Sequence, residues 1–119
     1  MKVKIRTLYL KVKDIQAAAQ FWEGLLQIKP HKYFDRWCEF WCGNIRLGLL
    51  SNDFNDRVQG SGCVPVFEFD DEALPAYIAR ARSLGAKVVL DGLENPKLRS
   101  IVFRDPEGHE FELSKFHDD

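Results

Sequence analysis

The sequence predicts an α+β fold of two tandem βαβββ modules, whose curved mixed sheets surround a shared cavity. The first observation behind this is an internal repeat at a constant offset of 57 residues (65 − 8 and 71 − 14), in which Leu8, Leu10, Val12 and Asp14 correspond to Pro65, Phe67, Phe69 and Asp71. The second is that each copy leads into one amphipathic helix pattern and then three short strand patterns. The length of 119 residues suits one compact domain. We divide it into a first module at about 1–51, a linker at 52–62 and a second module at about 63–119.

The first module opens with a strand and a helix. Apolar and polar residues alternate over about 3–12, as in a strand with one buried face. Asp14 is the expected N-cap of a helix over about 15–26, because an aspartate oxygen accepts hydrogen bonds from the free N–H groups of the first turn. Apolar residues recur in this helix at helical spacing. Pro30 prevents its continuation, since proline has no backbone N–H.

Three short strands complete the first module, over about 31–35, 37–42 and 45–51. Gly43 and Asn44 form the expected two-residue turn between the last two strands. This turn sets their register and places Trp41 opposite Arg46, Glu39 opposite Gly48 and Trp37 opposite Leu50. The residues between these positions are uniformly apolar and should pack against the helix.

The second module repeats the pattern. A strand near Phe67 and Phe69 precedes a helix over about 73–84, with Asp71 as its expected cap and Gly85 at its C-terminal end. Three further strands are expected over about 87–90, 98–104 and 109–115. The last two are joined by a type I turn, Asp105-Pro106-Glu107-Gly108, which has proline and glycine where such a turn favours them.

Strand alternation directs aromatic and acidic side chains to the faces opposite the helices, where they should line the cavity. The predicted ligand-binding residues are Tyr9, Trp37, Glu39, Trp41, Arg46, Gly48, Glu68, Glu110 and Glu112. Two indoles beside a carboxylate suit a small aromatic or cationic ligand, because stacking and cation–π contacts contribute about 0.5–2 kcal/mol each. Gly48 should leave room for ligand atoms opposite Glu39.

Composition excludes several classes of function. With 17 Lys+Arg against 18 Asp+Glu, the formal net charge is −1, so neither a nucleic acid nor a membrane surface is an expected partner. No signal peptide or apolar run of about 18 residues is present, and we expect a cytoplasmic protein. The three cysteines should be reduced, buried thiols, because their number is odd and their spacing fits no metal site: Cys38, Cys42 and Cys63. The three histidines are expected at the surface or in turns: His31, His109 and His117.

The repeat and several motifs resemble the vicinal oxygen chelate superfamily, which contains glyoxalases, extradiol dioxygenases and bleomycin-resistance-type binding proteins. The most specific motif is Phe103-Arg104-Asp105-Pro106-Glu107-Gly108-His109-Glu110-Phe111-Glu112-Leu113. Weaker motifs are Val12-Lys13-Asp14 leading into Phe21-Trp22, and Leu84-Gly85-Ala86. Gln27 stands where the family often has a helix-ending glycine, a departure that affects a cap and not the site. The resemblance implies one glyoxalase/bleomycin-resistance-like domain and a homodimer.

Metal-dependent members of this superfamily have four ligand positions, and in this sequence the resemblance places them at Thr7, Gly48, Val64 and Glu112. Only Glu112 binds a divalent cation well, whereas a catalytic metal needs about three protein ligands. The usual metal site is therefore not expected, and no cofactor is predicted. The aromatic and acidic face resembles that of the drug-binding members, such as those connected with antibiotic resistance.

Three functions remain open. The leading hypothesis is a protein that sequesters a small aromatic or cationic compound without metal chemistry. The alternative is a lyase, isomerase or dioxygenase with a non-standard site, in which Glu39 and Glu112 act as general base and acid or join Glu68 around Mg²⁺ or Mn²⁺. A scaffold whose tryptophans contact a protein partner is the third. Structural roles also remain open: a subunit interface for the tryptophans, an ion pair between Glu39 and Arg46, and repulsion between Glu110 and Glu112 that raises one pKa or turns one side chain outward.

Overall fold

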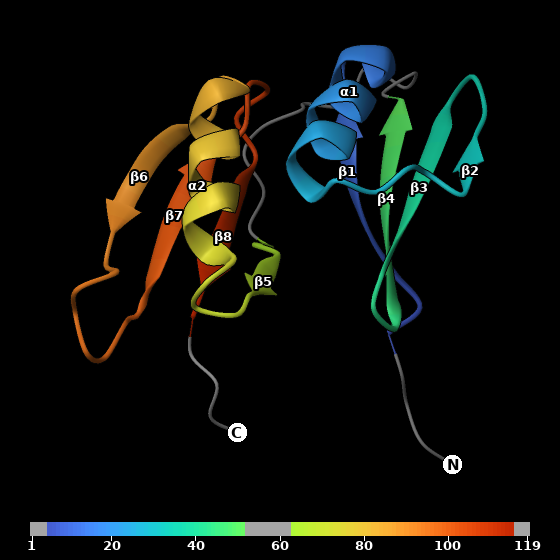
Figure 1. Cartoon of the computed structure of the whole chain (residues 1–119). Coiled ribbons are helices and arrows are strands. Elements are labelled where there is room, and N and C mark those ends of the chain that lie inside the picture. The colour runs from blue at the N-terminus through green and yellow to red at the C-terminus, as the bar shows by residue number, and fades with distance from the viewer. Residues whose placement is uncertain (1–4, 52–62, 116–119) are drawn as a thin grey trace. The chain divides into compact units, whose positions relative to one another are not determined.

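The structure, a computed structural model, describes residues 5–51 and 63–115. These residues form two compact units, each with a four-stranded mixed sheet and one helix (Figure 1). The order β-α-β-β-β occurs twice, which confirms the predicted α+β fold of two βαβββ modules. The expected linker over 52–62, the start of the first strand at residues 3–4 and His117 lie outside the described residues.

In the first unit the strands follow the order β1-β4-β3-β2 across the sheet. Strand β1 runs parallel to β4, and the remaining neighbours are antiparallel. The strands start and end close to the predicted positions, except that the first begins at residue 7 and the second is very short: β1 (Thr7–Val12), β2 (Lys32–Tyr33), β3 (Trp37–Cys42) and β4 (Ile45–Ser51).

Helix α1 (Ile15–Leu26) has the predicted N-cap. The Asp14 side chain accepts a hydrogen bond from the Ala17 N–H at 3.1 Å, and this satisfies one of the free donors of the first turn. At the other end Gln27 adopts the left-handed conformation, with φ of 59°, and its N–H donates to the Glu23 carbonyl at 2.9 Å. The left-handed conformation costs a residue with a Cβ atom, such as glutamine, about 1–2 kcal/mol, whereas glycine adopts it without this cost.

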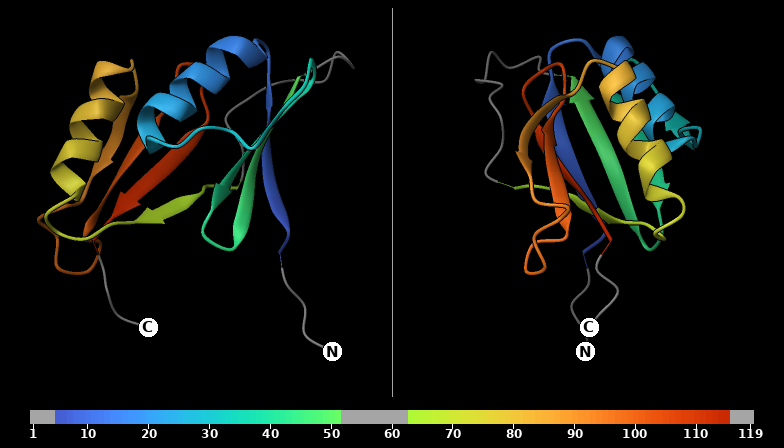
Figure 2. Two further views of the ribbon diagram at one scale, coloured as in Figure 1. Left: turned by 45° about the vertical axis from the view of Figure 1, so that its right-hand side comes forward. Right: turned by 60° about the vertical axis from the view of Figure 1, so that its left-hand side comes forward.

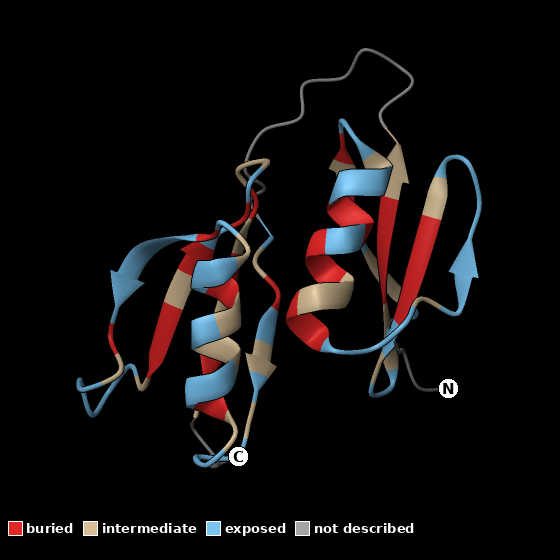
Figure 3. Ribbon diagram, turned by 45° about the horizontal axis from the view of Figure 1, so that its top comes forward, coloured by how far each residue is buried: buried red, intermediate tan, exposed pale blue. Residues whose placement is uncertain are grey.

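The core of the first unit lies between α1 and one face of the sheet (Figure 2). The helix contributes buried residues at helical spacing, which appear as the red bands of α1 in Figure 3. The sheet contributes the apolar residues that alternate with the predicted site residues: Cys38, Phe40, Leu47 and Leu49. Burying a large apolar side chain contributes about 1.5–3 kcal/mol, so this face holds the strands in one register. The opposite face of the same strands is free of the helix.

The second unit has the strand order β5-β8-β7-β6, with β5 parallel to β8 and the other pairs antiparallel. Helix α2 packs against β8, whose residues Phe111 and Leu113 are fully buried. The elements are β5 (Val66–Glu68), α2 (Leu74–Ser83), β6 (Lys87–Asp91), β7 (Ser100–Arg104) and β8 (Glu110–Ser114).

The expected Asp71 cap of this helix is wrong. Helix α2 begins after Ala73 without a side-chain cap, and residues 71–73 form a turn closed by the Asp70 carbonyl. Pro75 in the first helical turn has no N–H to donate, which removes one of the groups that a cap would satisfy. Gly85 follows the helix with φ of 94°, as predicted for a terminating glycine.

Strands β6 and β7 differ from prediction at their ends. Arg99 has φ of 51°, a left-handed conformation incompatible with a strand, so β7 begins at Ser100 instead of residue 98. The pairing of β6 with β7 shifts between Val88 and Leu90, which marks a β-bulge. Every residue of β6 is exposed, including the apolar side chains at its centre.

The predicted turn before β8 is present and buries more than expected. Gly108 N–H donates to the Asp105 carbonyl at 2.9 Å, and the Asp105 carboxylate accepts from the N–H groups of Glu107 and His109. His109 follows this turn, as expected, and is buried to 2% exposure. The turn folds the His109 ring inward because its N–H and carbonyl both bond back to Asp105.

In the described residues no helix is long and apolar enough to cross a bilayer.

Candidate functional site

The candidate site lies on the face of the first sheet that α1 leaves uncovered. The two-residue turn at Gly43 gives the predicted register, pairing Trp37 with Leu50, Glu39 with Gly48 and Trp41 with Arg46. Strand β1 adds Tyr9, which is aligned with Gly48. Because aligned residues share a face, Tyr9, Trp37, Glu39, Trp41 and Arg46 lie on one surface, which we call the open face.

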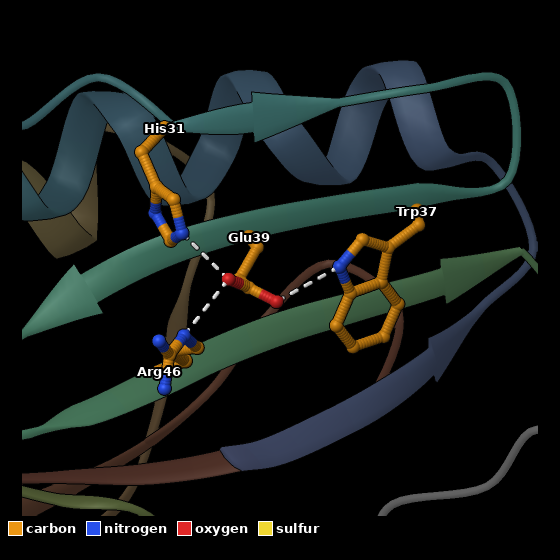
Figure 4. Close-up of polar contacts among 4 residues, drawn as sticks. All are labelled: His31, Trp37, Glu39 and Arg46. Carbon is orange, nitrogen blue, oxygen red and sulfur yellow. Dashed lines mark hydrogen bonds and ion pairs between the residues drawn. The ribbon is translucent and has the colours of Figure 1, made fainter. Parts of the chain in front are cut away.

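Glu39 is the centre of this face and contacts three side chains, one through a hydrogen bond and two through ion pairs (Figure 4). The Trp37 indole Nε1 donates to Oε1 at 3.0 Å. The second oxygen, Oε2, lies 2.6 Å from His31 Nε2 and 3.1 Å from Arg46 Nε. The Arg46 contact is an ion pair without the alignment of a hydrogen bond. Both carboxylate oxygens are therefore occupied by groups of the protein itself.

Glu39 is 4% exposed, which is rare for a glutamate unless its charge is compensated. Burial by itself raises the pKa of this carboxyl. The Trp37 hydrogen bond, the charge of Lys32 and the His31 contact outweigh that effect, so that the pKa of Glu39 lies below its usual value. Glu39 is thus a buried, ionised group.

Trp41 follows Glu39 by two residues and remains 44% exposed. The Arg46 guanidinium carbon lies 3.9 Å from the centroid of its ring, a cation–π contact. The His31 ring stacks on it with centroids 5.2 Å apart and an interplanar angle of 22°. Because both contacting groups also bind Glu39, the indole is held in a fixed position while part of its surface remains open to a ligand.

Trp37 fills the space that the sequence analysis assigns to ligand atoms. Its six-membered ring lies over Gly48, so close that an ideal Cβ added there would be 2.6 Å from Cζ2. Tyr9 meets Trp37 edge-to-face with centroids 5.9 Å apart. Gly48 therefore makes room for an indole of the same sheet. Tyr9 itself is 52% exposed.

His31 is the functional residue that the sequence analysis missed, because it assigned this side chain to a surface loop. Its N–H donates to the Glu39 carbonyl at 2.9 Å, and the register of β2 on β3 pairs Lys32 with Glu39. A two-residue strand carries no hydropathy pattern from which its register can be deduced. The available signal was the short connection to β3, which requires residues near 31 to lie beside Glu39.

The acidic residues of the second module lie on the uncovered face of the second sheet. Glu110 pairs with Arg104, whose Nη2 lies 3.2 Å from Oε2, and this pair compensates the charge that was expected to repel Glu112. Glu112 is aligned with Val66 and half-buried, and Glu68 is exposed beside Ser114. Alternation directs Phe111 and Leu113 to the other face, as predicted.

The four metal-ligand positions implied by the resemblance divide between the two units. Thr7 and Gly48 belong to the first, and Val64 and Glu112 to the second. Among residues 5–51 and 63–115, no three His, Cys, Asp or Glu side chains gather closely enough to hold a metal ion. The donor chemistry of Thr7, Gly48 and Val64 does not fit a catalytic metal centre.

The three cysteines are reduced thiols, as predicted. Cys38 is buried beneath the open face, where burial and the nearby Glu23 raise its pKa to about 11. Burial also raises the pKa of Cys42, which is half-buried. Cys63 is exposed, which corrects the expectation that all three are buried; it precedes β5 and belongs to no element.

Comparison with solved structures shows how widely this fold occurs. A protein of Agrobacterium tumefaciens solved by NMR is 20% identical, with a TM-score of 0.82 over 98% of this chain and 100% of that chain. The fosfomycin resistance protein FosX of Mesorhizobium loti is 23% identical, with a TM-score of 0.74 over 98% of this chain and 94% of that chain. A glyoxalase/bleomycin resistance protein/dioxygenase family enzyme of Burkholderia phytofirmans is 16% identical, with a TM-score of 0.77 over 93% and 97%. At such identities the likeness shows the fold alone.

Sequence comparison extends this result from fold to family. No curated protein matches the chain significantly. The model of one superfamily, however, matches residues 4–113, nearly the whole sequence, and includes both modules with the motif that ends in Leu113. The chain belongs to the Glyoxalase/Bleomycin resistance protein/Dioxygenase superfamily.

Proposed function

We propose that the chain binds a small planar aromatic compound on the open face of the first sheet, without metal chemistry. The observation that carries this proposal is the exposed Trp41 ring, fixed by Arg46 and His31 through their common partner Glu39. A tryptophan immobilised in this way loses little further freedom when a ligand stacks on it. Stacking contributes about 0.5–1.5 kcal/mol beyond the area it buries.

Tyr9 supports the same conclusion from the neighbouring strand. It is exposed, and its contact with Trp37 holds its ring on the same face as Trp41. Aromatic rings bury a large area and have few rotatable bonds, which suits them to binding flat molecules. Glu39 supports the ring positions and does not itself face a ligand, since its oxygens are occupied.

A titration tests this proposal directly. Isothermal titration calorimetry with naphthalene-based ligands should show binding to the wild-type chain and at least about fivefold weaker binding to Trp41→Ala, corresponding to about 1 kcal/mol. Tyr33→Ala is the matched control, because Tyr33 is equally exposed but aligned with Cys38 and hence directed away from the open face. If no naphthalene ligand binds, or if Trp41→Ala binds as tightly as wild type, the proposal fails.

The proposal includes assembly as a homodimer in the cytoplasm, with neither nucleic acid nor membrane as a partner. A chain of this size leaves a large sheet surface open, and closed two-fold dimers are the commonest oligomers. Light scattering during size-exclusion chromatography measures the mass directly. A mass of one chain, 13.8 kDa, at micromolar concentration contradicts this part of the proposal.

A second candidate is an acid–base enzyme of the same superfamily. Its supporting observation is the 2.6 Å contact between Glu39 Oε2 and His31 Nε2, because a buried carboxylate that orients an imidazole is a common arrangement for a general base. The proton carrier would then be His31, not Glu39. Turnover of a substrate that is lost in His31→Gln would favour this candidate. Stoichiometric Mn, Fe, Ni or Zn that Glu112→Ala removes would instead favour a metal-dependent enzyme.

A further inference from the structure

We infer that the aromatic ligand of the open face carries an anionic group, of the carboxylate class, which Arg46 holds while the ring stacks on Trp41. This inference rests on the proposed function and adds the charge of the ligand to it. Some polar groups of the face are already bound by the protein itself, and others are available to a ligand.

The acidic group of the face is not available to a ligand. Glu39 accepts from Trp37 on one oxygen and contacts His31 and Arg46 with the other, and it is almost completely buried. A cationic ligand would have to displace one of these partners and leave it without its carboxylate. Removing one partner of a buried ion pair leaves an uncompensated buried charge, which costs more than a new surface contact returns. The site therefore disfavours a cation.

The available polar groups are hydrogen-bond donors. Arg46 uses Nε for Glu39, and its two terminal nitrogens have no hydrogen bond or ion pair among the described residues. The Trp41 Nε1 and the Tyr9 hydroxyl likewise have none within residues 5–51 and 63–115, and both side chains are exposed. A guanidinium edge with free N–H groups matches the two oxygens of a carboxylate. The guanidinium carbon lies 3.9 Å from the centroid of the Trp41 ring, so Arg46 covers one face of the indole and its N–H groups lie within reach of a ligand on the exposed part of the ring.

The charged side chains of the open face also favour an anionic ligand. Among the described strand residues, pairing places two bases on it, Lys32 and Arg46, and one carboxylate, Glu39. His31 adds a further positive charge whenever it is protonated. The field over the open face therefore attracts an anion, although the whole chain is nearly neutral.

Three matched ligands separate charge from stacking: 1-naphthylacetate, the neutral 1-naphthylacetamide and the cationic 2-(1-naphthyl)ethylamine. They share one ring and one methylene spacer, so calorimetry compares their terminal groups. We expect the carboxylate to bind about tenfold more tightly than the amide, since charge-assisted hydrogen bonds are about twice as strong as neutral ones. The amine should bind most weakly. Higher salt should reduce the preference for the carboxylate.

Arg46→Gln should remove this preference, so that acetate and amide bind alike. Arg46→Lys retains the charge without the planar fork and should keep an intermediate preference, which also covers the case in which the glutamine variant does not fold. Arg104→Gln is the matched control, because Arg104 is paired with Glu110 on the second sheet. Thermal unfolding of each variant verifies that it folds.

The outcomes distinguish the two proposals. A carboxylate preference that Arg46→Gln abolishes and Arg104→Gln retains supports the inference. Equal affinity for the three ligands, or preference for the amine, overturns the inference and leaves aromatic binding standing. A carboxylate preference that persists in Arg46→Gln and Arg46→Lys also overturns it. If none of the three binds, the proposed function and the inference fail together.

Discussion

Replacing Gly48 with alanine tests whether the Trp37 ring is held in place or merely rests on the sheet. The added methyl group would overlap the Trp37 ring, with Cζ2 at 2.6 Å and Cζ3 at 2.9 Å from the ideal Cβ position. The ring can move away only by breaking the Nε1 hydrogen bond to Glu39 and the edge contact with Tyr9. The backbone at Gly48 is not left-handed, so alanine meets no conformational strain there.

The expected loss follows from these contacts. Forcing an extra methyl group into a packed site costs about 1–3 kcal/mol. A hydrogen bond to a charged group contributes about 1.5–3 kcal/mol, and alanine returns about 0.4–1 kcal/mol by restricting the unfolded chain. The ring either stays and is overpacked or moves and loses its hydrogen bond, so the two costs do not add in full. Gly48→Ala should therefore lower the free energy of unfolding by about 2–4 kcal/mol.

Urea unfolding followed by circular dichroism measures this change, and a double-mutant cycle assigns it. In a Trp37→Ala background, Gly48→Ala should be close to neutral, because the ring that the methyl group meets is gone. Gly43→Ala is the matched control: it has φ of 65° and no atom within 4 Å of its Cβ position, so its cost of about 1–2 kcal/mol comes from the backbone alone and is independent of Trp37. A change below 0.5 kcal/mol for Gly48→Ala, or an equal cost in the Trp37→Ala background, would refute the reasoning.

Three further predictions follow from the described contacts. Because the pKa of Glu39 is lowered, its contribution to stability is complete above the ordinary value of 4.5 and is lost as the pH falls through the lower folded value. Glu39→Gln should therefore weaken the loss of stability at acid pH, measured by urea unfolding at several pH values. Burial raises the pKa of Asp105, which acts in the opposite direction, so the comparison with wild type isolates the effect of Glu39. An acid-side pH dependence equal to that of wild type would contradict the assignment. A maleimide should label Cys63 in the native chain, while Cys38, whose pKa burial raises to about 11, should react only after unfolding. Mass spectrometry of peptides distinguishes the two labelled cysteines. Rapid labelling of Cys38 in the native chain would be the contrary result. Gln27→Gly should raise the free energy of unfolding by about 0.5–1 kcal/mol, since glycine adopts φ of 59° without strain. Gln20→Gly inside α1 is the control and should lower the free energy of unfolding by about 1 kcal/mol. A loss of stability at both sites would show that the Gln27 side chain, which donates to the Gly24 carbonyl, matters more than its backbone.

The strand register of the first unit could be predicted from the sequence because two independent signals agree. The Gly43-Asn44 turn and the uniformly apolar alternate residues both require Trp41 to face Arg46, and a shift by one residue would expose Phe40. The ion pair between Glu39 and Arg46, which the sequence analysis kept as an alternative, follows directly from this register.

Side-chain placement could not be predicted where it depends on a contact without a periodic pattern. His31 enters the site through a strand of two residues, and the Trp37 ring turns over Gly48 because its Nε1 binds Glu39. His109 is buried beside a turn whose position was predicted correctly, and its N–H donates to the Asp105 carboxylate. At Trp37 and His109 the backbone was predictable, whereas the direction of the ring was decided by a polar partner; at His31 the register of the short strand was itself not predictable.

The bulge in β6 changes how the edge of the second sheet could pair with strands of other molecules. Val88, Val89 and Leu90 form an exposed apolar stretch at the border of the second sheet, the kind of segment that recruits strands from other molecules into amyloid-like ladders. The register shift between Val88 and Leu90 interrupts the row of N–H and C=O groups that such a ladder would extend. The bulge in β6 thus makes this apolar edge strand a poorer template for pairing with strands of other molecules.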